Sequence, residues 1–326
     1  MKTTYDFIDE NKRRTVLIVL LFPLLFAVLA YITILLVTPF VINAESADGA
    51  LYQAGTVAYA NYFSMYIIPA AVALVIVWIV ISYFVGGNMI LSSAGAVEIT
   101  RDSNPEIYEL TDAVAIAAGL PTPKIYLMND SSLNAFATGR DPQHAAIALT
   151  SGIIAKLNRQ ELETVIAHEM AHIGNRDIRL MLVVVSGIAF FTFAGLFLLR
   201  FGGLRGGRGR RGKGAFLIFA AAVVCLIYGY MVAPLIRLAL SRRREYQADA
   251  TSALLTRNPA ALASALEKIS GDSVVESLSD HEPVAAMCIE NPLKKRGLFS
   301  FLSGMSATHP PTQDRIRVLR EMDGRI

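Results

Sequence analysis

The sequence predicts a mainly α-helical membrane protein that carries a small α+β domain outside the bilayer. Hydrophobic residues make up 54% of the 326 residues, and the mean hydropathy is +0.46. Ordinary soluble proteins have an apolar fraction nearer about 45 to 50% even with glycine included. The excess lies in four long apolar runs, and the composition between the second and third runs and after the fourth is that of a soluble protein. We therefore expect four apolar helices, and a folded domain built from two separate stretches of the chain.

The first two apolar runs predict an amino-terminal membrane hairpin in residues 1–86. Thr15 to Phe40 and Ser64 to Val85 carry no charged residue, and each is longer than the roughly 20 residues that cross a bilayer core. The competing interpretation of the first run is a cleaved signal peptide, whose apolar part is only about 7 to 15 residues long. The length of the run favours a membrane anchor.

The charges that flank this hairpin predict its orientation. Basic residues stand just before the first run, at positions 12 to 14, whereas the segment between the runs contains Glu45 and Asp48 and no Lys or Arg. Short loops rich in Lys and Arg stay in the cytoplasm. We therefore expect the amino terminus, and the chain that follows Val85, to face the cytoplasm.

Residues 87–177 should form the first part of the folded domain. Ser103, followed by Asn104, Pro105 and Glu106, marks the start of a helix that ends at Gly119. Strands are then predicted at three short segments rich in apolar or β-branched residues: Lys124 to Met128, Asn134 to Thr138 and Ala145 to Leu149.

A second helix in this part carries the pattern that points to chemistry. Asn158 is its predicted N-cap, with Glu161 in the capping-box position. Further along are His168, Glu169 and His172, an H-E-x-x-H motif. Residues four apart lie on one face of a helix, so both histidines can reach one metal ion, and the glutamate can lean over a water bound to it. The alternative is two histidines on the polar face of an ordinary amphipathic helix.

The third and fourth apolar runs predict a second membrane hairpin in residues 178–240. Ile178 to Leu199 and Ala215 to Leu240 each contain one arginine, and each is long enough to span. The linker 200–214 is rich in Arg and Gly, so full crossing would place it outside, against the positive-inside rule. A shallow hairpin would keep it in the cytoplasm, but the lengths favour crossing. With one aromatic residue, the linker fits contact with lipid headgroups better than RNA binding, and no nucleic-acid partner is expected.

Residues 241–326 should complete the folded domain. Helices are predicted after Leu240, from Asn258-Pro259 to Ile269, and from Thr312 to Met322. The two cysteines, Cys225 and Cys288, have no paired spacing, so the sequence supports neither a disulfide framework nor a cysteine zinc site.

A catalytic zinc ion needs three protein ligands, and the third must come from elsewhere in the chain. The extended motif H-E-x-x-H-x-x-G-x-x-H is excluded, because Asn175 and Ile178 stand at its last two positions. No acidic residue occurs from Ile178 to Arg244, so Glu245 is the first candidate downstream. Asp249 lies four residues later on the same helix face and could accept the N–H of a ligand histidine. Alternatively, Glu245 pairs with Arg242 or Arg244 at the membrane surface.

This set of groups predicts peptide hydrolysis. Zinc brings the pKa of a bound water near 7, and Glu169 would take the proton of that water and pass it to the leaving amine. The oxyanion that forms needs a donor, for which His309 and Arg315 are candidates. His144 and His281 have no partner spacing and are interpreted as structural.

These motifs together resemble the HtpX-type membrane zinc metallopeptidases, which are related more distantly to the CAAX prenyl endopeptidases. The resemblance covers nearly the whole chain, with four motifs in order: N-A-F-A at 134–137, H-E-M-A-H followed by N-R-D at 175–177, E-Y-Q-A-D at 245–249 and H-P-P at 309–311. The linker 200–214 matches no motif of the family.

The resemblance implies a gluzincin-type catalytic domain with one zinc ion held by His168, His172 and Glu245. It also implies that Asn134, Ala135, Phe136 and Ala137 form an edge strand along which the substrate lies, and it supports His309 and Arg315 as groups near the transition state. The implied role is quality control of unfolded or damaged membrane proteins in the cytoplasmic membrane, with lipids as further partners. A prenyl-protein protease and a non-catalytic zinc scaffold are the alternatives.

Overall fold

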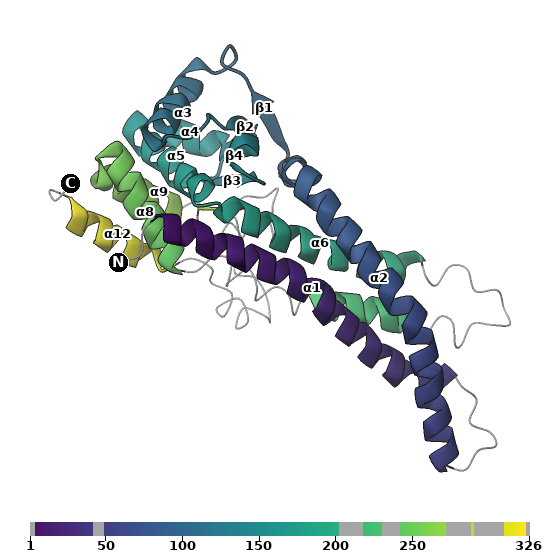
Figure 1. Cartoon of the computed structure of the whole chain (residues 1–326). Helices are drawn as coiled ribbons and strands as arrows, with labels where there is room; N and C mark the ends of the chain where they lie inside the picture. The colour runs from purple at the N-terminus through teal and green to yellow at the C-terminus, as the bar shows by residue number, and fades with distance from the viewer. Residues whose placement is uncertain are drawn as a thin grey trace. The chain divides into compact units, whose positions relative to one another are not determined.

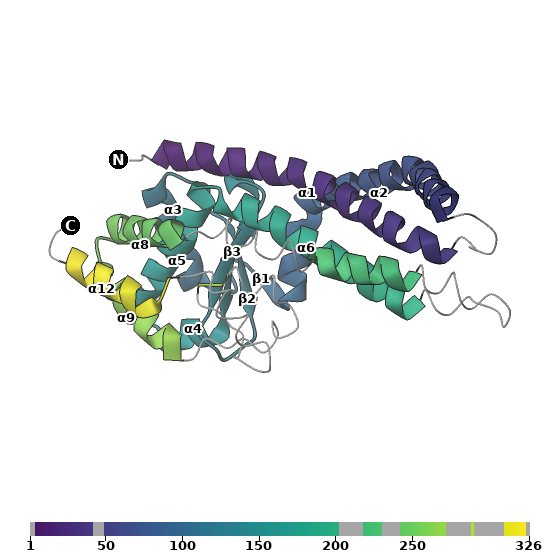
Figure 2. The same ribbon diagram turned by 90° about the horizontal axis from the view of Figure 1, so that it is seen from below.

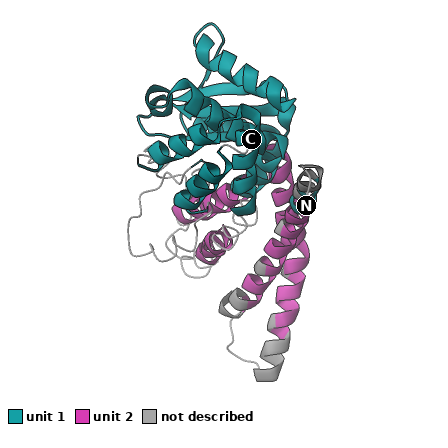
Figure 3. Cartoon of the chain, turned by 90° about the vertical axis from the view of Figure 1, so that its left-hand side faces the viewer, with its two compact units in different colours: residues 1–15, 82–185, 234–326 teal, residues 16–81, 186–233 magenta. Residues whose placement is uncertain are grey.

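The computed structural model describes six stretches of the chain: residues 4–41, 49–201, 218–229, 242–271, 288–289 and 310–323. These residues form mainly helices and one small sheet, as the sequence predicts (Figure 1). They divide into two compact units (Figure 3). The first unit contains residues 1–15, 82–185 and 234–326, and the second contains residues 16–81 and 186–233.

Three helices are long and apolar enough to cross a membrane: α1 (Thr4–Val41), α2 (Gly49–Ser93) and α6 (Asp177–Phe201). They correspond to three of the four predicted apolar helices. For the fourth, the structure describes only a shorter apolar helix, Ile218–Gly229. Most of the basic linker 200–214 lies outside the described residues, so the expectations about it stay predictions.

Within the second unit, aromatic side chains join the apolar helices. The Phe191 ring lies 5.0 Å from that of Phe26 and 4.2 Å from that of Tyr228, centroid to centroid. The Trp78 indole donates a hydrogen bond of 3.0 Å to the Ser186 carbonyl. An indole N–H in an apolar region needs such an acceptor, so this bond fixes the neighbouring turns of α2 and α6.

The first unit contains a four-stranded mixed sheet, which Figure 2 shows from below. The strand order is β1-β2-β4-β3. Its strands are β1 (Ala96–Ile99), β2 (Lys124–Met128), β3 (Ala135–Gly139) and β4 (Ala145–Thr150). Strands β2 and β4 are parallel, and the other two pairings are antiparallel. The three predicted strands are confirmed within one residue at each end, and β1 is an addition. The order leaves β3 at one edge of the sheet.

Gly139 ends β3 and allows the chain to return as β4. Its φ of +137° is unfavourable for residues with a side chain, and a Cβ atom built there would lie 2.3 Å from the carbonyl oxygen of His144. The short connection contains a single 3-10 turn, Pro142–His144. In the resulting pairing Ala135 lies opposite Leu149.

Helix α5 (Arg159–Gly174) is central to the first unit. It packs against β3 and β4 and against three helices: α3 (Pro105–Ala118), α8 (Arg242–Thr256) and α9 (Pro259–Gly271). The described residues of this unit also form α4 (Ser151–Lys156) and α12 (Thr312–Met322), and α12 packs against α9. The predicted helix between Ser103 and Gly119 is confirmed: Asn104 is its N-cap, and Gly119 is in a left-handed conformation after its last turn.

Glu161 connects the start of α5 to α9. The predicted capping box is present, since Asn158 accepts from the Glu161 N–H at 2.9 Å and the Glu161 carboxylate accepts from the Asn158 N–H at 2.9 Å. The same carboxylate also accepts from Ser264 at 2.7 Å and from Lys268 at 2.6 Å. The buried Glu161 carboxylate therefore accepts from three donors, which fixes the first turn of α5.

Candidate active site

Two histidines of α5 face the same point. His168 and His172 are one helical turn apart, and their Nε2 atoms are 3.2 Å from each other. His168 is almost fully buried, and the His172 side chain is 13% exposed. This is the arrangement that the four-residue spacing predicts for two ligands of one metal ion.

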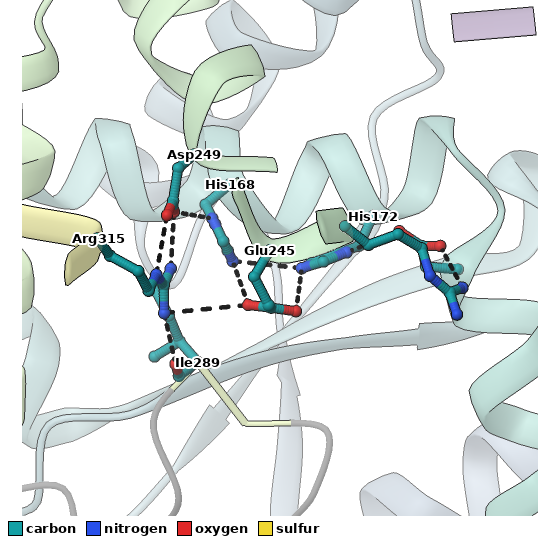
Figure 4. A network of polar contacts seen from close by, with 8 residues as sticks. His168, His172, Glu245, Asp249, Ile289 and Arg315 are labelled. Atoms are coloured by element: carbon teal, nitrogen blue, oxygen red, sulfur yellow. Dashed lines mark hydrogen bonds and ion pairs between the residues drawn. The ribbon is translucent and has the colours of Figure 1, made fainter. Parts of the chain in front are cut away.

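Glu245 of α8 meets both histidines. One carboxylate oxygen lies 3.7 Å from Nε2 of His168, and the other lies 3.7 Å from Nε2 of His172 (Figure 4). Helix α8 packs along α5, which brings the fully buried Glu245 to this position. The candidate ligand atoms of the three residues all lie within 4.8 Å of one another.

These separations suit a tetrahedral metal ion. Donor atoms about 2.1 Å from such an ion lie roughly 3.4 Å from one another. The distances of 3.2, 3.7 and 3.7 Å between the candidate donors are close to that value. Two imidazole nitrogens and one carboxylate could therefore hold a first-row divalent ion with little rearrangement.

The charges around the three donors also favour a divalent cation. Among the described residues near them, four carboxylates and two guanidinium groups are buried: Glu169, Asp177, Glu245 and Asp249, with Arg244 and Arg315. The group is therefore short of two positive charges. Uncompensated buried charge is costly, and a divalent cation would balance the group. Without it, the negative surroundings raise the pKa of His172 to about 9, because Asp177 and Glu245 outweigh the lowering effect of burial.

Asp249 contacts the Nδ1 side of the His168 ring, and Arg315 binds Asp249. Nδ1 of His168 lies 3.0 Å from Oδ1 of Asp249. Arg315 donates two hydrogen bonds to the same carboxylate, from Nε at 2.8 Å and from Nη2 at 2.7 Å. Burial would raise the pKa of Asp249, but Arg315 outweighs it and lowers the pKa to about 2. The Asp249 carboxylate is thus charged, and it faces the N–H side of the imidazole.

His172 has corresponding partners of its own. Its Nδ1 lies 2.9 Å from Oδ2 of Asp177, and Oδ1 of Asp177 accepts a hydrogen bond of 2.9 Å from Arg244. Arg176, in a left-handed conformation with φ of 60°, makes the turn between α5 and α6 that precedes Asp177. No role for Asp177 was predicted from the sequence, and Arg244 was predicted only as an alternative partner of Glu245. The available signal was weak: an Asp just past the end of the motif helix, and an Arg next to Glu245.

Glu169 is buried beside the three donors. Burial raises the pKa of its carboxyl group, although His168 and His172 oppose this effect. The backbone of Ala137 in β3 contributes a hydrogen bond to the carboxylate. Glu169 and the donors line a cavity of about 20 Å³, which has room for about one water molecule. A carboxylate next to a water-sized space can act as a proton acceptor.

The edge strand lies at this cavity. Asn134, Ala135, Phe136 and Ala137 are all buried, and Ala137 lines the cavity. The carbonyl oxygen of Ala135 accepts a hydrogen bond of 2.9 Å from the backbone N–H of Ile289. The outer edge of β3 therefore takes a backbone hydrogen bond from another segment of the chain, as strand addition requires.

The remaining predicted site residues have different positions. Arg315 is fully buried and contacts Asp249 and the Ile289 carbonyl, with its Nη1 3.9 Å from Glu245. Its predicted contact with a transition state stays a prediction. His309 lies outside the described residues. Cys288, which the sequence analysis set aside, is buried and lines the cavity; burial and the nearby Glu169 raise the pKa of its thiol.

Comparison with known families identifies the chemistry. Residues 101–323 match peptidase family M48. The chain belongs to this family. The matched region extends from before α3 to the end of α12, and so contains the three candidate metal ligands and Glu169.

Relatives of this M48 peptidase match along nearly its whole length. The chain is 39% identical over 317 residues to a Protease HtpX homolog of Bacteroides fragilis, covering 96% of this chain and 97% of the relative. It is 36% identical over 335 residues to a Protease HtpX homolog of Dictyoglomus turgidum, covering 99% and 96%. The predicted resemblance to the HtpX-type peptidases is therefore confirmed.

Among solved structures, this M48 peptidase is similar to Ste24p of S. mikatae, with 19% sequence identity and a TM-score of 0.44. The match covers 76% of this chain and 56% of that one. The family and the relatives make this chain a membrane-bound metalloprotease, as predicted. They do not favour a non-catalytic scaffold.

Proposed function

We propose that this M48 peptidase is a zinc-dependent endopeptidase whose metal ligands are His168, His172 and Glu245. The observation that carries the proposal is the convergence of these three donors, 3.2 to 3.7 Å apart, from two helices that are far apart in sequence. Three protein ligands leave one position open, which is typical of catalytic zinc sites. Two imidazoles and one carboxylate suit zinc better than magnesium or calcium, which prefer oxygen ligands.

Glu169 is the proposed general base. When bound, the zinc ion supplies Lewis-acid chemistry, which makes water more acidic and the scissile carbonyl more electrophilic. Glu169 takes the proton of the attacking water, holds it on its carboxyl group and delivers it to the leaving amine. Its burial supports this role, because a raised pKa suits a group that must both accept and donate a proton.

The substrate backbone is proposed to lie along β3. In the antiparallel β3–β4 pair, alternate residues point their backbone groups away from β4. Ala135 is one of these, because its carbonyl oxygen bonds to Ile289 and not to β4. An extended peptide would pair with this edge in place of the Ile289 backbone, and it would then pass the cavity that Glu169 lines.

The proposed substrates are unfolded or damaged membrane proteins, cleaved on the cytoplasmic side of the cytoplasmic membrane. The three candidate spans support a location in the membrane. The positive charges at positions 12 to 14, and the acidic segment after the first span, support a catalytic domain that faces the cytoplasm. We also keep the proposal that the chain from Ala215 to Leu240 is a fourth span, with lipid headgroups as the partners of the basic linker.

The decisive experiment compares the wild type with Glu169→Gln in detergent micelles, using casein as an unfolded substrate. We expect the variant to keep its zinc and lose cleavage. Glu163→Gln is the matched control, because Glu163 lies on the same helix away from the cavity, and it should keep both. Full cleavage by Glu169→Gln would refute the assigned base, and a zinc-free wild type that cleaves casein would refute the metal. Cleavage of a prenylated peptide but not of casein would favour the prenyl-protein protease.

A further inference from the structure

The two candidate histidine ligands have matching surroundings. On the side of each ring that faces away from Glu245, an aspartate lies within 3.0 Å of Nδ1, and a buried arginine binds that aspartate. For His168 the pair is Asp249 and Arg315, and for His172 it is Asp177 and Arg244. We propose that Asp177 and Arg244 are positioning residues, which orient His172 for metal binding in the way that Asp249 orients His168. The inference rests on the proposed zinc site.

A carboxylate at Nδ1 decides which nitrogen of the ring can bind a metal. In a neutral imidazole one nitrogen carries the proton and the other offers a lone pair. Oδ2 of Asp177 lies 2.9 Å from Nδ1 of His172, where it can accept a hydrogen bond from the Nδ1–H group. Nε2 of His172, which lies 3.2 Å from Nε2 of His168, is then left as the ligand atom. An acceptor of this kind also fixes the ring plane and makes the ligand more basic.

Arg244 has two effects on Asp177. Its guanidinium binds Oδ1 at 2.9 Å, so the oxygen that faces His172 is held in place by a contact to the other oxygen. It also compensates the charge of a carboxylate whose side chain is only 4% exposed. A carboxylate buried without a cation would be strongly destabilised, so Arg244 keeps the acceptor in place for His172.

The positions of Asp177 and Arg244 in the chain explain how they reach His172 and each other. Asp177 is the first residue of α6, and the left-handed Arg176 turns the chain so that the Asp177 carboxylate comes back to His172. Arg244 directly precedes Glu245 on α8, and neighbouring side chains on a helix point about 100° apart. One residue of α8 therefore reaches Asp177 while the next faces the histidines.

The alternative is that Asp177 and Arg244 form an ion pair that only joins α6 to α8. Such a pair would affect folding, but it would not change the zinc affinity of the molecules that are folded. Glu161 and Lys268 provide a comparison within the same protein, since they join α5 to α9 through a buried carboxylate that touches no candidate ligand. A change in zinc affinity therefore distinguishes a residue that orients His172 from an ion pair that only joins two helices.

The test measures the zinc dissociation constant of the full chain in detergent micelles, by competition with a chromophoric chelator. We expect Asp177→Asn to raise this constant about 10- to 100-fold. Arg244→Lys, which keeps the charge and loses the planar fork, should raise it less than Arg244→Gln does. The control, Glu161→Gln, should lower the melting temperature and leave the constant within about twofold of the wild type.

A zinc constant within twofold of the wild type in both Asp177→Asn and Arg244→Gln would overturn the inference. If one of these two variants is poorly folded, the other decides by the same criterion. With saturating zinc, Asp177→Asn should lower kcat for casein more than it raises KM, because a tilted ligand affects the reaction and leaves the β3 edge unchanged. A failure of the proposed function is distinguishable, because the wild type would then bind no zinc or Glu169→Gln would remain active.

Discussion

The guanidinium group of Arg315 and the carboxylate of Asp249 form a two-point contact, with hydrogen bonds of 2.8 and 2.7 Å, in a place without solvent access. Arg315 comes from α12 and Asp249 from α8. The contact therefore attaches the last described helix to the helix that carries Glu245. Planar, paired hydrogen bonds of this kind are the strongest that arginine makes.

Loss of the contact between Arg315 and Asp249 should strongly destabilise the folded protein. Arg315→Gln leaves the Asp249 carboxylate buried without its cation, so we expect the free energy of unfolding to fall by about 3 to 5 kcal/mol. Arg317→Gln is the matched control on the same helix, because the Arg317 side chain is 69% exposed, and it should change stability by less than about 0.5 kcal/mol. Both are measured by denaturant unfolding in the Glu169→Gln background, which prevents self-cleavage. Equal effects of the two substitutions would contradict the prediction.

Removal of the metal should destabilise the protein. The buried group around the histidines lacks two positive charges, so the chelator-treated protein should melt at a lower temperature than the zinc-loaded protein. At a free zinc concentration 100 times the dissociation constant, the expected stabilisation is about 2.7 kcal/mol. Glu245→Gln should lose most of this zinc-dependent gain, and magnesium should not replace zinc. An unchanged melting temperature after zinc removal would count against a bound metal.

Glu161 predicts a pH dependence of stability that is separate from catalysis. Burial alone would raise the pKa of Glu161, but hydrogen bonds from Lys268 and Ser264 hold it below its ordinary value. Since the folded pKa lies below the unfolded value of about 4.3, the stabilisation is complete above that value. It is lost as the pH falls through the folded pKa.

We therefore expect the difference in melting temperature between the wild type and Lys268→Met to be constant near neutral pH and to shrink below about pH 4.3. Lys124→Met is the control, because Lys124 pairs with Glu98 at the surface, where ion pairs contribute little. If the melting temperatures of the wild type and Lys268→Met instead move further apart as the pH falls, the pKa of Glu161 is not lowered in the folded protein.

Gly139 should tolerate no side chain. Gly139→Ala combines an unfavourable φ with a Cβ atom 2.3 Å from backbone, so the end of β3 must shift. Gly95→Ala is the matched control, because Gly95 also has positive φ but nothing lies within 4 Å of its Cβ position. Gly95→Ala should cost about 1 kcal/mol of unfolding free energy. Gly139→Ala should cost clearly more and should also reduce casein cleavage, and equal effects would argue against a tight turn at this position.

Local signals predicted the helix that carries the histidines. Asn158 and Glu161 mark its start by residue type alone, because a capping box depends only on neighbours in the chain. The strands β2, β3 and β4 were also predictable from their short apolar segments. By contrast, β1 has only four residues, and its two central residues are exposed. Such a strand shows neither alternation nor a long apolar run, which are the patterns that predict strands.

Contacts between distant residues were predictable only where chemistry required them. Glu245 was expected near the histidines, because a two-histidine motif needs a third ligand. Nothing in the residue types required Asp177 to contact His172, since their proximity depends on the left-handed turn at Arg176. The bond between Ile289 and Ala135 joins two backbone groups, and backbone groups are the same for nearly every residue type.

The separation of Glu245 from the two histidines has a consequence for the timing of synthesis. The ribosome makes α5 first, then the whole apolar segment that begins with α6, and only afterwards the helix with Glu245. Arg315, which holds Asp249, is made later still. A nascent chain therefore carries the H-E-x-x-H motif for some time without a third donor. With Glu245 as the proposed third ligand, the metal site could not be complete, and the peptidase could not become active, until the segment between the two halves of the domain has been made.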